Sequence, residues 1–157
     1  MTRFPFATAV QDVYNAVYME AQRHSHTLTL EIQPNMPEVV ADRERVVQVM
    51  MNVVSNSIKY TPDGGTIHVY AGHKGEKVSM VVDDNGIGIP EKDRDRIFER
   101  FYRVDKARSR QSGGTGLGLS IAKEIIERHE GALELVDKQG PGLAVRMELK
   151  IEGPSHG

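Results

Sequence analysis

The sequence predicts an α+β fold of two layers, an open α/β sandwich in which helices cover one face of a sheet. Three segments place apolar residues at the 3.6-residue spacing of an amphipathic helix, and five shorter segments alternate apolar and polar residues as half-buried strands do. Elements that are apolar on one side must bury that side against a second layer. The 157 residues have the length of one ordinary domain and contain no repeat and no internal boundary.

The first part of the chain alternates between the two patterns. Helical spacing of apolar residues predicts a helix over 7–23, and alternation with threonine and glutamate predicts a strand over 28–32. After two prolines, Asp42 is the expected N-cap of a second helix that ends near Tyr60. The middle of the chain then predicts a strand pair.

These middle strands cover 66–72 and 77–83 and are joined by a tight turn at Lys74-Gly75. A glycine-bearing loop and a short helix within 91–101 come next, and the basic, patternless residues 102–114 are expected to form a loop.

The last part of the chain predicts a helix over 116–129 and two strands, over 132–136 and 143–151, around a Gly-Pro-Gly turn. Residues 152–157 are expected to be a disordered tail.

Composition excludes several functional classes. The chain has no cysteine, which rules out disulfides, thiolate metal sites and cysteine nucleophiles. Its net charge of −2 predicts no general attraction to nucleic acid or to an anionic membrane. No apolar run approaches the ~20 residues of a membrane span, and we expect no signal peptide after Met1.

The second helix carries an unusual polar face. Helical geometry puts Gln48, Asn52, Ser55, Asn56 and Lys59 within an arc of roughly 100°. Carboxamide oxygens can ligate a hard cation such as Mg²⁺, and an ammonium group can neutralise phosphate. The alternative is a solvated helix face, and this helix alone leaves both interpretations open. The opposite side is apolar and comprises Val46, Val47, Met50, Val53, Val54 and Ile58.

Two glycine-rich loops favour the binding interpretation. In residues 84–90, Asp-Asn-Gly-Ile-Gly-Ile-Pro, the carboxylate of Asp84 can accept a hydrogen bond from a ligand amine, although taken alone the segment resembles an ordinary turn. In residues 113–119, Gly-Gly-Thr-Gly-Leu-Gly-Leu, backbone N–H groups at a helix start can attract anions. Gly116 and Gly118 each cost a helix up to ~1 kcal/mol, which a simple helix-start turn does not explain. The spacings do not fit a P-loop, a Rossmann fingerprint, His-Glu-x-x-His or Gly-x-Ser-x-Gly.

Taken together, these motifs resemble the ATP-binding catalytic domain of bacterial sensor histidine kinases, within the superfamily that includes DNA gyrase B and MutL. Four segments resemble the four sequence motifs, or boxes, of that family. Residues 52–62 resemble its asparagine box, 84–88 its first glycine box, 98–105 its aromatic box and 114–119 its second glycine box. The segment Arg-Phe-Tyr-Arg-Val-Asp-Lys-Ala-Arg most resembles the cell-wall and phosphate-sensing kinases of Gram-positive bacteria. The resemblance implies a Bergerat-type fold, with a mixed, mainly antiparallel sheet and about three helices on one face.

The resemblance also implies a role for each box. Asp84 would accept from the adenine amine, Tyr60 would pack on the base, and residues 102–114 would form a lid over the phosphates. Lys106 and Arg108 in that lid are equally compatible with a solvated loop. The implied catalytic residues are Asn52, Asn56, Lys59 and Arg103, and the implied metal ligands are Asn52 and Asn56. The implied nucleotide-binding residues are Asn56, Lys59, Tyr60, Asp84, Gly86, Gly88, Ile89, Tyr102, Lys106, Thr115, Gly116, Leu117, Gly118 and Leu119.

Two positions depart from the family pattern. Leu143 follows Gly-Pro-Gly where the family usually has threonine, which puts nucleotide contacts there in doubt. Glu130 replaces the first glycine of the family's His-Gly-Gly, a change expected to matter little, and His129 is expected to be a helix C-terminal histidine rather than a catalytic one.

Transfer rather than hydrolysis is expected. Asn52 stands where the ATPases of the superfamily have a glutamate base, and a carboxamide cannot take the proton of water. None of the six histidines has the context of the family's acceptor histidine, so residues 7–151 are expected to be a catalytic domain and residues 1–6 a linker remnant from a missing acceptor hairpin. The open alternatives are an anti-sigma-type serine kinase, an ATPase clamp and a non-enzymatic ATP-binding protein.

The expected cofactors are ATP and Mg²⁺. The expected partners are ATP or ADP, the acceptor-histidine domain of the parent kinase and, through that kinase, a response regulator, with no nucleic acid. The parent is expected to be a membrane-anchored homodimer with this domain on its cytoplasmic side, and the fragment itself a monomer.

Overall fold

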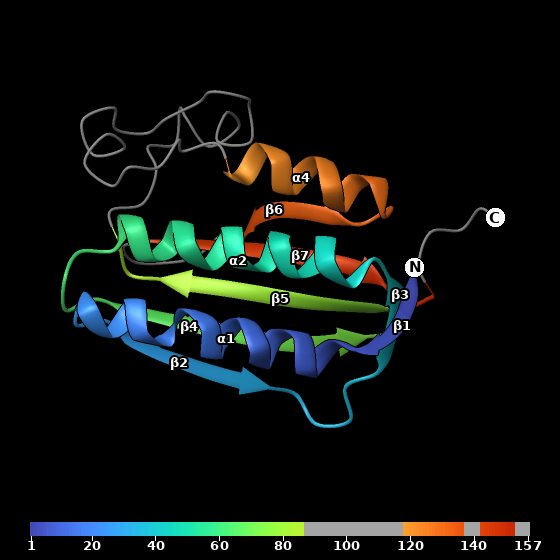
Figure 1. Ribbon diagram of the computed structural model, residues 1–157, viewed down its shortest axis with the longest axis horizontal. Helices are drawn as coiled ribbons and strands as arrows, with labels where there is room; N and C mark the ends of the chain where they lie inside the picture. The colour runs from blue at the N-terminus through green and yellow to red at the C-terminus, as the bar shows by residue number, and fades with distance from the viewer. Residues whose placement is uncertain (87–117, 137–141, 153–157) are drawn as a thin grey trace.

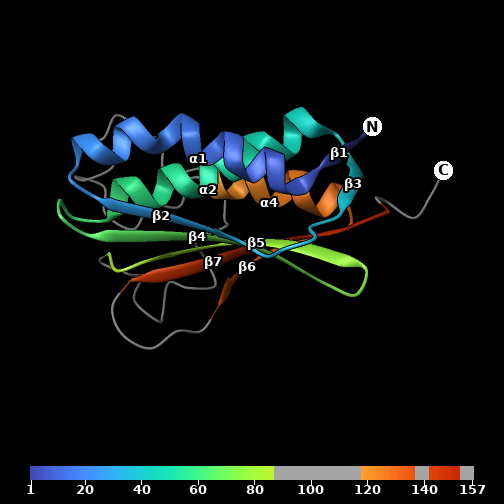
Figure 2. The same ribbon diagram turned by 90° about the horizontal axis from the view of Figure 1, so that it is seen from below.

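The computed structural model describes residues 1–86, 118–136 and 142–152. Within these ranges, three helices lie on one face of a five-stranded sheet, as the two views in Figures 1 and 2 show. The helices are α1 (Phe6–Arg23), α2 (Arg43–Tyr60) and α4 (Gly118–Arg128). The strands of this sheet are β2 (Thr27–Ile32), β4 (Thr66–Lys74), β5 (Lys77–Asp84), β6 (Ala132–Val136) and β7 (Leu143–Lys150). The predicted two-layer sandwich is confirmed.

The sheet is mixed and mainly antiparallel, as expected. Its strand order is β2-β4-β5-β7-β6, and β2 runs parallel to β4 while all the other neighbours in it are antiparallel. Asp84, the last residue of β5, pairs with Leu143, the first residue of β7. This register brings together two segments that are far apart in the sequence, and it builds one wall of the site described below.

A second, two-stranded sheet was not predicted. β1 (Thr2–Pro5) pairs antiparallel with β3 (Glu38–Ala41), and Phe4 is buried opposite Val39. β3 is also hydrogen-bonded to the end of the chain, since the Val40 N–H donates to the Ile151 carbonyl. Both strands are only four residues long, β1 ends in Pro5 and β3 follows Pro37, so neither carries a readable alternation. Residues 1–6, expected to be a linker, are thus packed on the domain, and their origin as a linker stays a prediction.

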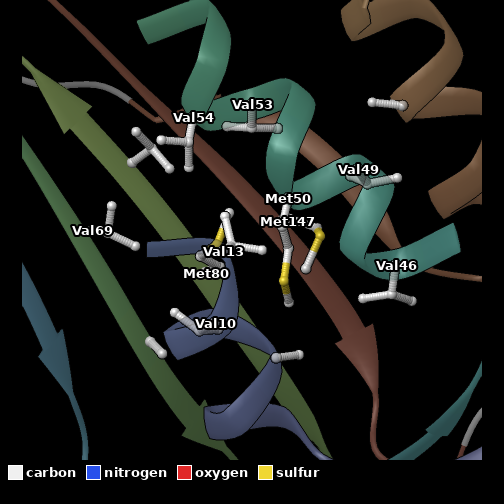
Figure 3. Close-up of a cluster of buried hydrophobic side chains, with 14 of the residues drawn as sticks. Val10, Val13, Val46, Val49, Met50, Val53, Val54, Val69, Met80 and Met147 are labelled. Atoms are coloured by element: carbon white, nitrogen blue, oxygen red, sulfur yellow. The ribbon is translucent and has the colours of Figure 1, made fainter. Parts of the chain in front are cut away.

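The core lies between the helices and the sheet. Figure 3 shows α1 and α2 directing valines and Met50 onto Met80 and Met147 of the sheet, and all of these side chains are buried. Asp42 is the N-cap of α2, because its carboxylate accepts from the Arg45 N–H at 3.3 Å, as predicted. The predicted apolar stripe of α2 needs one correction. Val49 was left out of it, yet Val49 is fully buried because it points toward α4, whereas Val47 is only half-buried.

The other face of the sheet is polar and carries paired charges. Glu134 binds Arg146 across β6 and β7, and this hydrogen bond raises the pKa of the Arg146 guanidinium. Lys77 lies 3.4 Å from Glu148 on the same face. Each such exposed ion pair contributes at most ~1 kcal/mol to the stability of the fold. The charged side chains suit a sheet face that contacts water. No helix in the part of the chain that the structure describes is long and apolar enough to cross a lipid bilayer.

Candidate functional site

Four chain segments that carry the predicted motifs meet at one end of the sandwich. α2 ends at Tyr60 and β5 ends at Asp84, and both ends lie on the same side in Figure 1. β7 starts there at Leu143, opposite Asp84, and α4 starts there at Gly118. The sheet and the helical layer thus bring motifs from separate parts of the sequence to one place.

Asp84 is the only buried acidic residue among those described, with 6% of its surface exposed. One of its carboxylate oxygens, Oδ1, accepts hydrogen bonds from the backbone N–H groups of Gly86 at 2.9 Å and Leu143 at 3.2 Å. Hydrogen bonds are what allow a buried carboxylate to exist at tolerable cost. Two donors on one oxygen also fix the plane of the carboxyl group, so the orientation of Asp84 is set before any ligand arrives.

Two glycines make this arrangement possible. A Cβ atom at Gly86 would lie 2.6 Å from the Tyr60 carbonyl oxygen, closer than real Cβ atoms approach, so only glycine lets the chain that leaves β5 pass the end of α2. Gly142 has φ +97°, and a Cβ atom there would overlap the Asp84 carbonyl group. Both glycines are therefore required for close backbone approach around Asp84.

The asparagine face of α2 is half-buried rather than fully solvated. Asn52, Asn56, Lys59 and Tyr60 are all intermediate in exposure. The Asn56 side-chain nitrogen donates to the backbone carbonyl oxygen of Asn52 at 3.0 Å. A carbonyl only accepts, so this bond identifies the nitrogen end of the amide and leaves Asn56 to present its oxygen, Oδ1, on the other side.

Among the described residues, no group of three or more acidic and histidine side chains could hold a metal ion. The amide oxygens of α2, together with oxygens of a ligand, form the donor set that a hard cation would find. The residues present therefore fit Mg²⁺ bound jointly by protein and ligand.

The structure describes eight of the sequence-predicted site residues. Asn52, Asn56, Lys59 and Tyr60 lie on α2, Asp84 and Gly86 lie at the end of β5, and Gly118 and Leu119 open α4. The Leu119 side chain is buried in the core, so any contact of this residue with a ligand would come from its backbone. The remaining predicted residues lie outside the described ranges and stay predictions: Gly88, Ile89, Tyr102, Arg103, Lys106, Thr115, Gly116 and Leu117.

Two residues at this end were missed by the sequence analysis. Thr61, the C-cap of α2, is 2% exposed, and its carbonyl accepts from Nε2 of the buried His26 at 2.8 Å. Their remaining side-chain polar atoms, Thr61 Oγ1 and His26 Nδ1, are the two buried side-chain polar atoms without a hydrogen-bond partner in the described residues. The position of Thr61 between a helix end and Pro62 was the available signal, because the residue before a proline leaves the helix.

His129 has the structural role that was predicted for it. It is buried at the end of α4, where Nδ1 donates to the Ile125 carbonyl at 2.9 Å. Its other ring nitrogen, Nε2, accepts from the backbone N–H of Asp42 at 3.3 Å. These two bonds fix the neutral tautomer and tie the end of α4 to the start of α2.

Comparison with known proteins identifies the class that this fold and site define. Residues 41–153 match the family of histidine kinase-, DNA gyrase B-, and HSP90-like ATPases. This match covers most of the chain, so the chain belongs to that family, and the predicted family is confirmed.

The curated relatives are sensor histidine kinases. The chain is 42% identical over 126 residues to the sensor histidine kinase WalK of Bacillus subtilis (strain 168), an alignment that covers 76% of this chain and 21% of WalK. It is 37% identical over 153 residues to the sensor-like histidine kinase SenX3 of Mycobacterium tuberculosis (strain ATCC 25618 / H37Rv), covering 94% of this chain and 37% of SenX3. The chain thus spans only about a fifth to two fifths of the length of these relatives.

Solved structures agree with this assignment. The catalytic domain of the histidine kinase ThkA superposes with a TM-score of 0.85 at 29% identity, over 96% of this chain and 95% of that domain. The mycobacterial sensor histidine kinase MprB superposes with a TM-score of 0.81 at 28% identity, over 97% of this chain and 99% of that one.

Proposed function

We propose that this chain binds ATP with Mg²⁺ and transfers the γ-phosphoryl group to a histidine on a separate dimerisation domain of the same sensor kinase. The observation that carries the proposal is the buried Asp84 carboxylate, held in a fixed orientation by two backbone N–H groups beside a glycine that cannot be replaced. A buried acceptor of this kind suits the exocyclic amine of adenine, because an amine donor compensates the desolvated carboxylate.

The phosphates would extend from the base along α2. Lys59 is one turn of helix from Ser55 and lies on the same face as Asn52 and Asn56, so its ammonium group can neutralise phosphate oxygens. Tyr60 is half-buried at the end of the same helix, where its ring can cover the base. The backbone of Gly116, Gly118 and their neighbours completes the proposed phosphate site.

Asn56 is the proposed main ligand of Mg²⁺, with Asn52 beside it. The Asn56 nitrogen is bonded to the backbone, so the group that faces a ligand is a carboxamide oxygen, which is the atom a hard cation prefers. When bound, Mg²⁺ would neutralise charge on the phosphates. The side chains of α2 would orient the Mg²⁺ ion and the phosphates. They would also keep both at a fixed distance from Asp84, where the base would bind.

Asn52 favours transfer over hydrolysis. A general base must take a proton from water, and a carboxamide has no useful basicity for that step. Phosphoryl transfer depends mainly on positioning and charge neutralisation, which this site can supply without a base of its own. The site would therefore hold ATP intact until an acceptor is delivered.

The acceptor is proposed to lie outside this chain. His26 and His129 are buried and hydrogen-bonded to backbone groups, which suits structural roles rather than phosphorylation. ThkA has been solved in complex with the response regulator protein TrrA, and this chain aligns with ThkA over 96% of its own length and 41% of that chain. By analogy, we propose a response regulator as the downstream partner and a longer, membrane-anchored dimer as the parent.

The binding step is tested by titrating ADP and Mg²⁺ into the protein in a calorimeter. Asp84→Asn should abolish measurable binding, because it replaces the acceptor and removes the charge. Asp83→Asn, a neutralisation at the adjacent exposed position of β5, is the matched control and should bind as the unmodified chain does. Equal ADP affinity in the Asp84→Asn variant would refute the assignment of Asp84.

The transfer step needs a separate assay. With γ-labelled ATP, the chain alone should take up no stable label, and label should appear on an added dimerisation domain that carries the acceptor histidine. Stable labelling of this chain by itself would contradict the proposal that its acceptor lies elsewhere.

A further inference from the structure

We propose that the hydroxyl group of Thr61 recognises the purine together with Asp84. In the nucleotide-bound protein it would donate a hydrogen bond, directly or through one enclosed water, to a ring nitrogen next to the amine that Asp84 accepts. The inference rests on the proposed function, which it deepens by adding a residue that determines base specificity.

The first observation is the orientation of the Thr61 side chain. In space, the Thr61 side chain lies between two glycines. Its methyl group faces Gly65 and its hydroxyl oxygen faces Gly86. A Cβ atom placed at Gly86 would lie 3.0 Å from Thr61 Oγ1 and 3.1 Å from Asp84 Oδ1. Both oxygens are thus within about 3 Å of one point beside Gly86, so the hydroxyl is aimed at the same place as the carboxylate.

The second observation is that this hydroxyl is buried and makes no hydrogen bond within the described residues. A buried polar group without a partner is costly, and valine would fill the same space without that cost. Binding of a ligand at Asp84 would supply the missing partner. Gly86 and Leu143 also approach the Asp84 carboxylate, but each contributes only a backbone N–H, and the Leu143 side chain is apolar.

The third observation is that Thr61 is held rigidly. The buried His26 donates from Nε2 to the Thr61 carbonyl at 2.8 Å, and Pro62 restricts the backbone on the other side. The extended backbone of Thr61, with φ −101° and ψ 123°, lies in a region that both serine and valine adopt. Substitutions at this position therefore change the hydroxyl without forcing the chain to move.

The pairing of groups matches adenine and not guanine. Adenine presents an amine donor flanked by ring-nitrogen acceptors, which complements a carboxylate acceptor beside a hydroxyl donor. Guanine presents an oxygen acceptor in place of the amine and an N–H donor at ring position 1, which reverses the pattern. A binding site that has hydrogen-bonding groups for one base rejects the other because those groups are left unpaired.

The test compares Thr61→Val with Thr61→Ser in the 157-residue chain. Calorimetry should show ADP binding about five- to tenfold weaker in Thr61→Val, the loss expected for one neutral hydrogen bond, and within about threefold of the unmodified chain in Thr61→Ser. The melting temperature of Thr61→Val without nucleotide should be unchanged or raised, because the unpaired hydroxyl is gone. If Thr61 had a purely structural role, Thr61→Val would instead lower the melting temperature. The relative affinities for ADP and its analogues would then be unchanged.

Two analogues identify the ligand atom. In the unmodified chain, either 1-deaza-ADP or 7-deaza-ADP should bind about five- to tenfold more weakly than ADP. That penalty should disappear in Thr61→Val, since the hydroxyl and the ring nitrogen are then already uncoupled. The inference is overturned if Thr61→Val binds ADP as the unmodified chain does, or if both analogues show the same penalty with and without the hydroxyl. Failure of the proposed function is distinguishable: the unmodified chain would then not bind ADP, or Asp84→Asn would bind it normally.

Discussion

The end of α4 offers a quantitative test of backbone strain. The Gly131 N–H donates to the Ile126 carbonyl and the Glu130 N–H to the Glu127 carbonyl, which together form the Schellman arrangement that closes a helix. Glu130 takes the left-handed position of this motif with φ +59°. Glycine is the usual residue there, because a side chain in that conformation is strained. We predict that Glu130→Gly stabilises the fold.

The magnitude follows from two opposing effects. A left-handed residue with a Cβ atom costs roughly 1–2 kcal/mol, and glycine relieves this. Glycine also gives the unfolded chain more freedom, which costs roughly 0.4–1 kcal/mol. The relief is larger, so the net gain is about 1 kcal/mol. With an unfolding entropy of about 2.1 cal/mol/K per residue, a chain of 157 residues should gain roughly 3 °C in melting temperature.

The assay is thermal unfolding followed by circular dichroism, without nucleotide. Asn35→Gly is the matched control: Asn35 also has a positive φ, of +62°, but asparagine tolerates this conformation, so little change is expected. Glu127→Gly, in the last turn of α4, should lower the free energy of unfolding by up to ~1 kcal/mol. The reasoning is refuted if Glu130→Gly melts at the same temperature as the unmodified chain or below it.

Three further outcomes are expected. Gly142→Ala should abolish ADP binding, because its Cβ would overlap the Asp84 carbonyl; calorimetry that shows normal affinity would contradict the required close approach. His129→Leu should lower the free energy of unfolding in urea by roughly 1–3 kcal/mol, since the Asp42 N–H and the Ile125 carbonyl lose their partner, and an unchanged midpoint would show that the bridge contributes nothing. Asn52→Glu adds a base and should therefore raise the rate of ATP hydrolysis by up to ~10²-fold in a phosphate-release assay. Asn52→Gln adds no base and should not raise it. Equal rates in both variants would exclude a missing base as the reason for slow hydrolysis.

Much of the fold was predictable because its elements carry strong local patterns. The helical spacing along α1 and α2 and the alternation along β4 and β5 are repeated over enough residues to be read without a structure. The Asp42 cap was readable for the same reason, since capping depends on residues three positions apart. The strands β1 and β3 were not readable, because four residues next to prolines leave no period to detect.

The candidate site divides in the same way. Asp84 and Asn56 were found because each stands in a motif whose residues are close in sequence. Thr61 and His26 were missed, because their significance depends on a contact between residues 35 positions apart and on burial that no local pattern reveals. The left-handed backbone of Glu130 was not predicted, because it is a property of how α4 ends against β7.

The sequence alone determined the class of this protein, the three helices and five main strands that the structure describes, and the types of chemical group available for binding. These depend on periodicity and on short motifs, which are properties of neighbouring residues. The predicted short helix within 91–101 lies outside the described residues and stays a prediction. Only the tertiary structure decided that the Leu143 N–H reaches Asp84, that Thr61 directs a buried hydroxyl toward the same point, and that β2 lies parallel to β4. The physical reason is that strand pairing and burial are set by segments far apart in the chain, whose approach is stabilised by the shared core and not by any local preference.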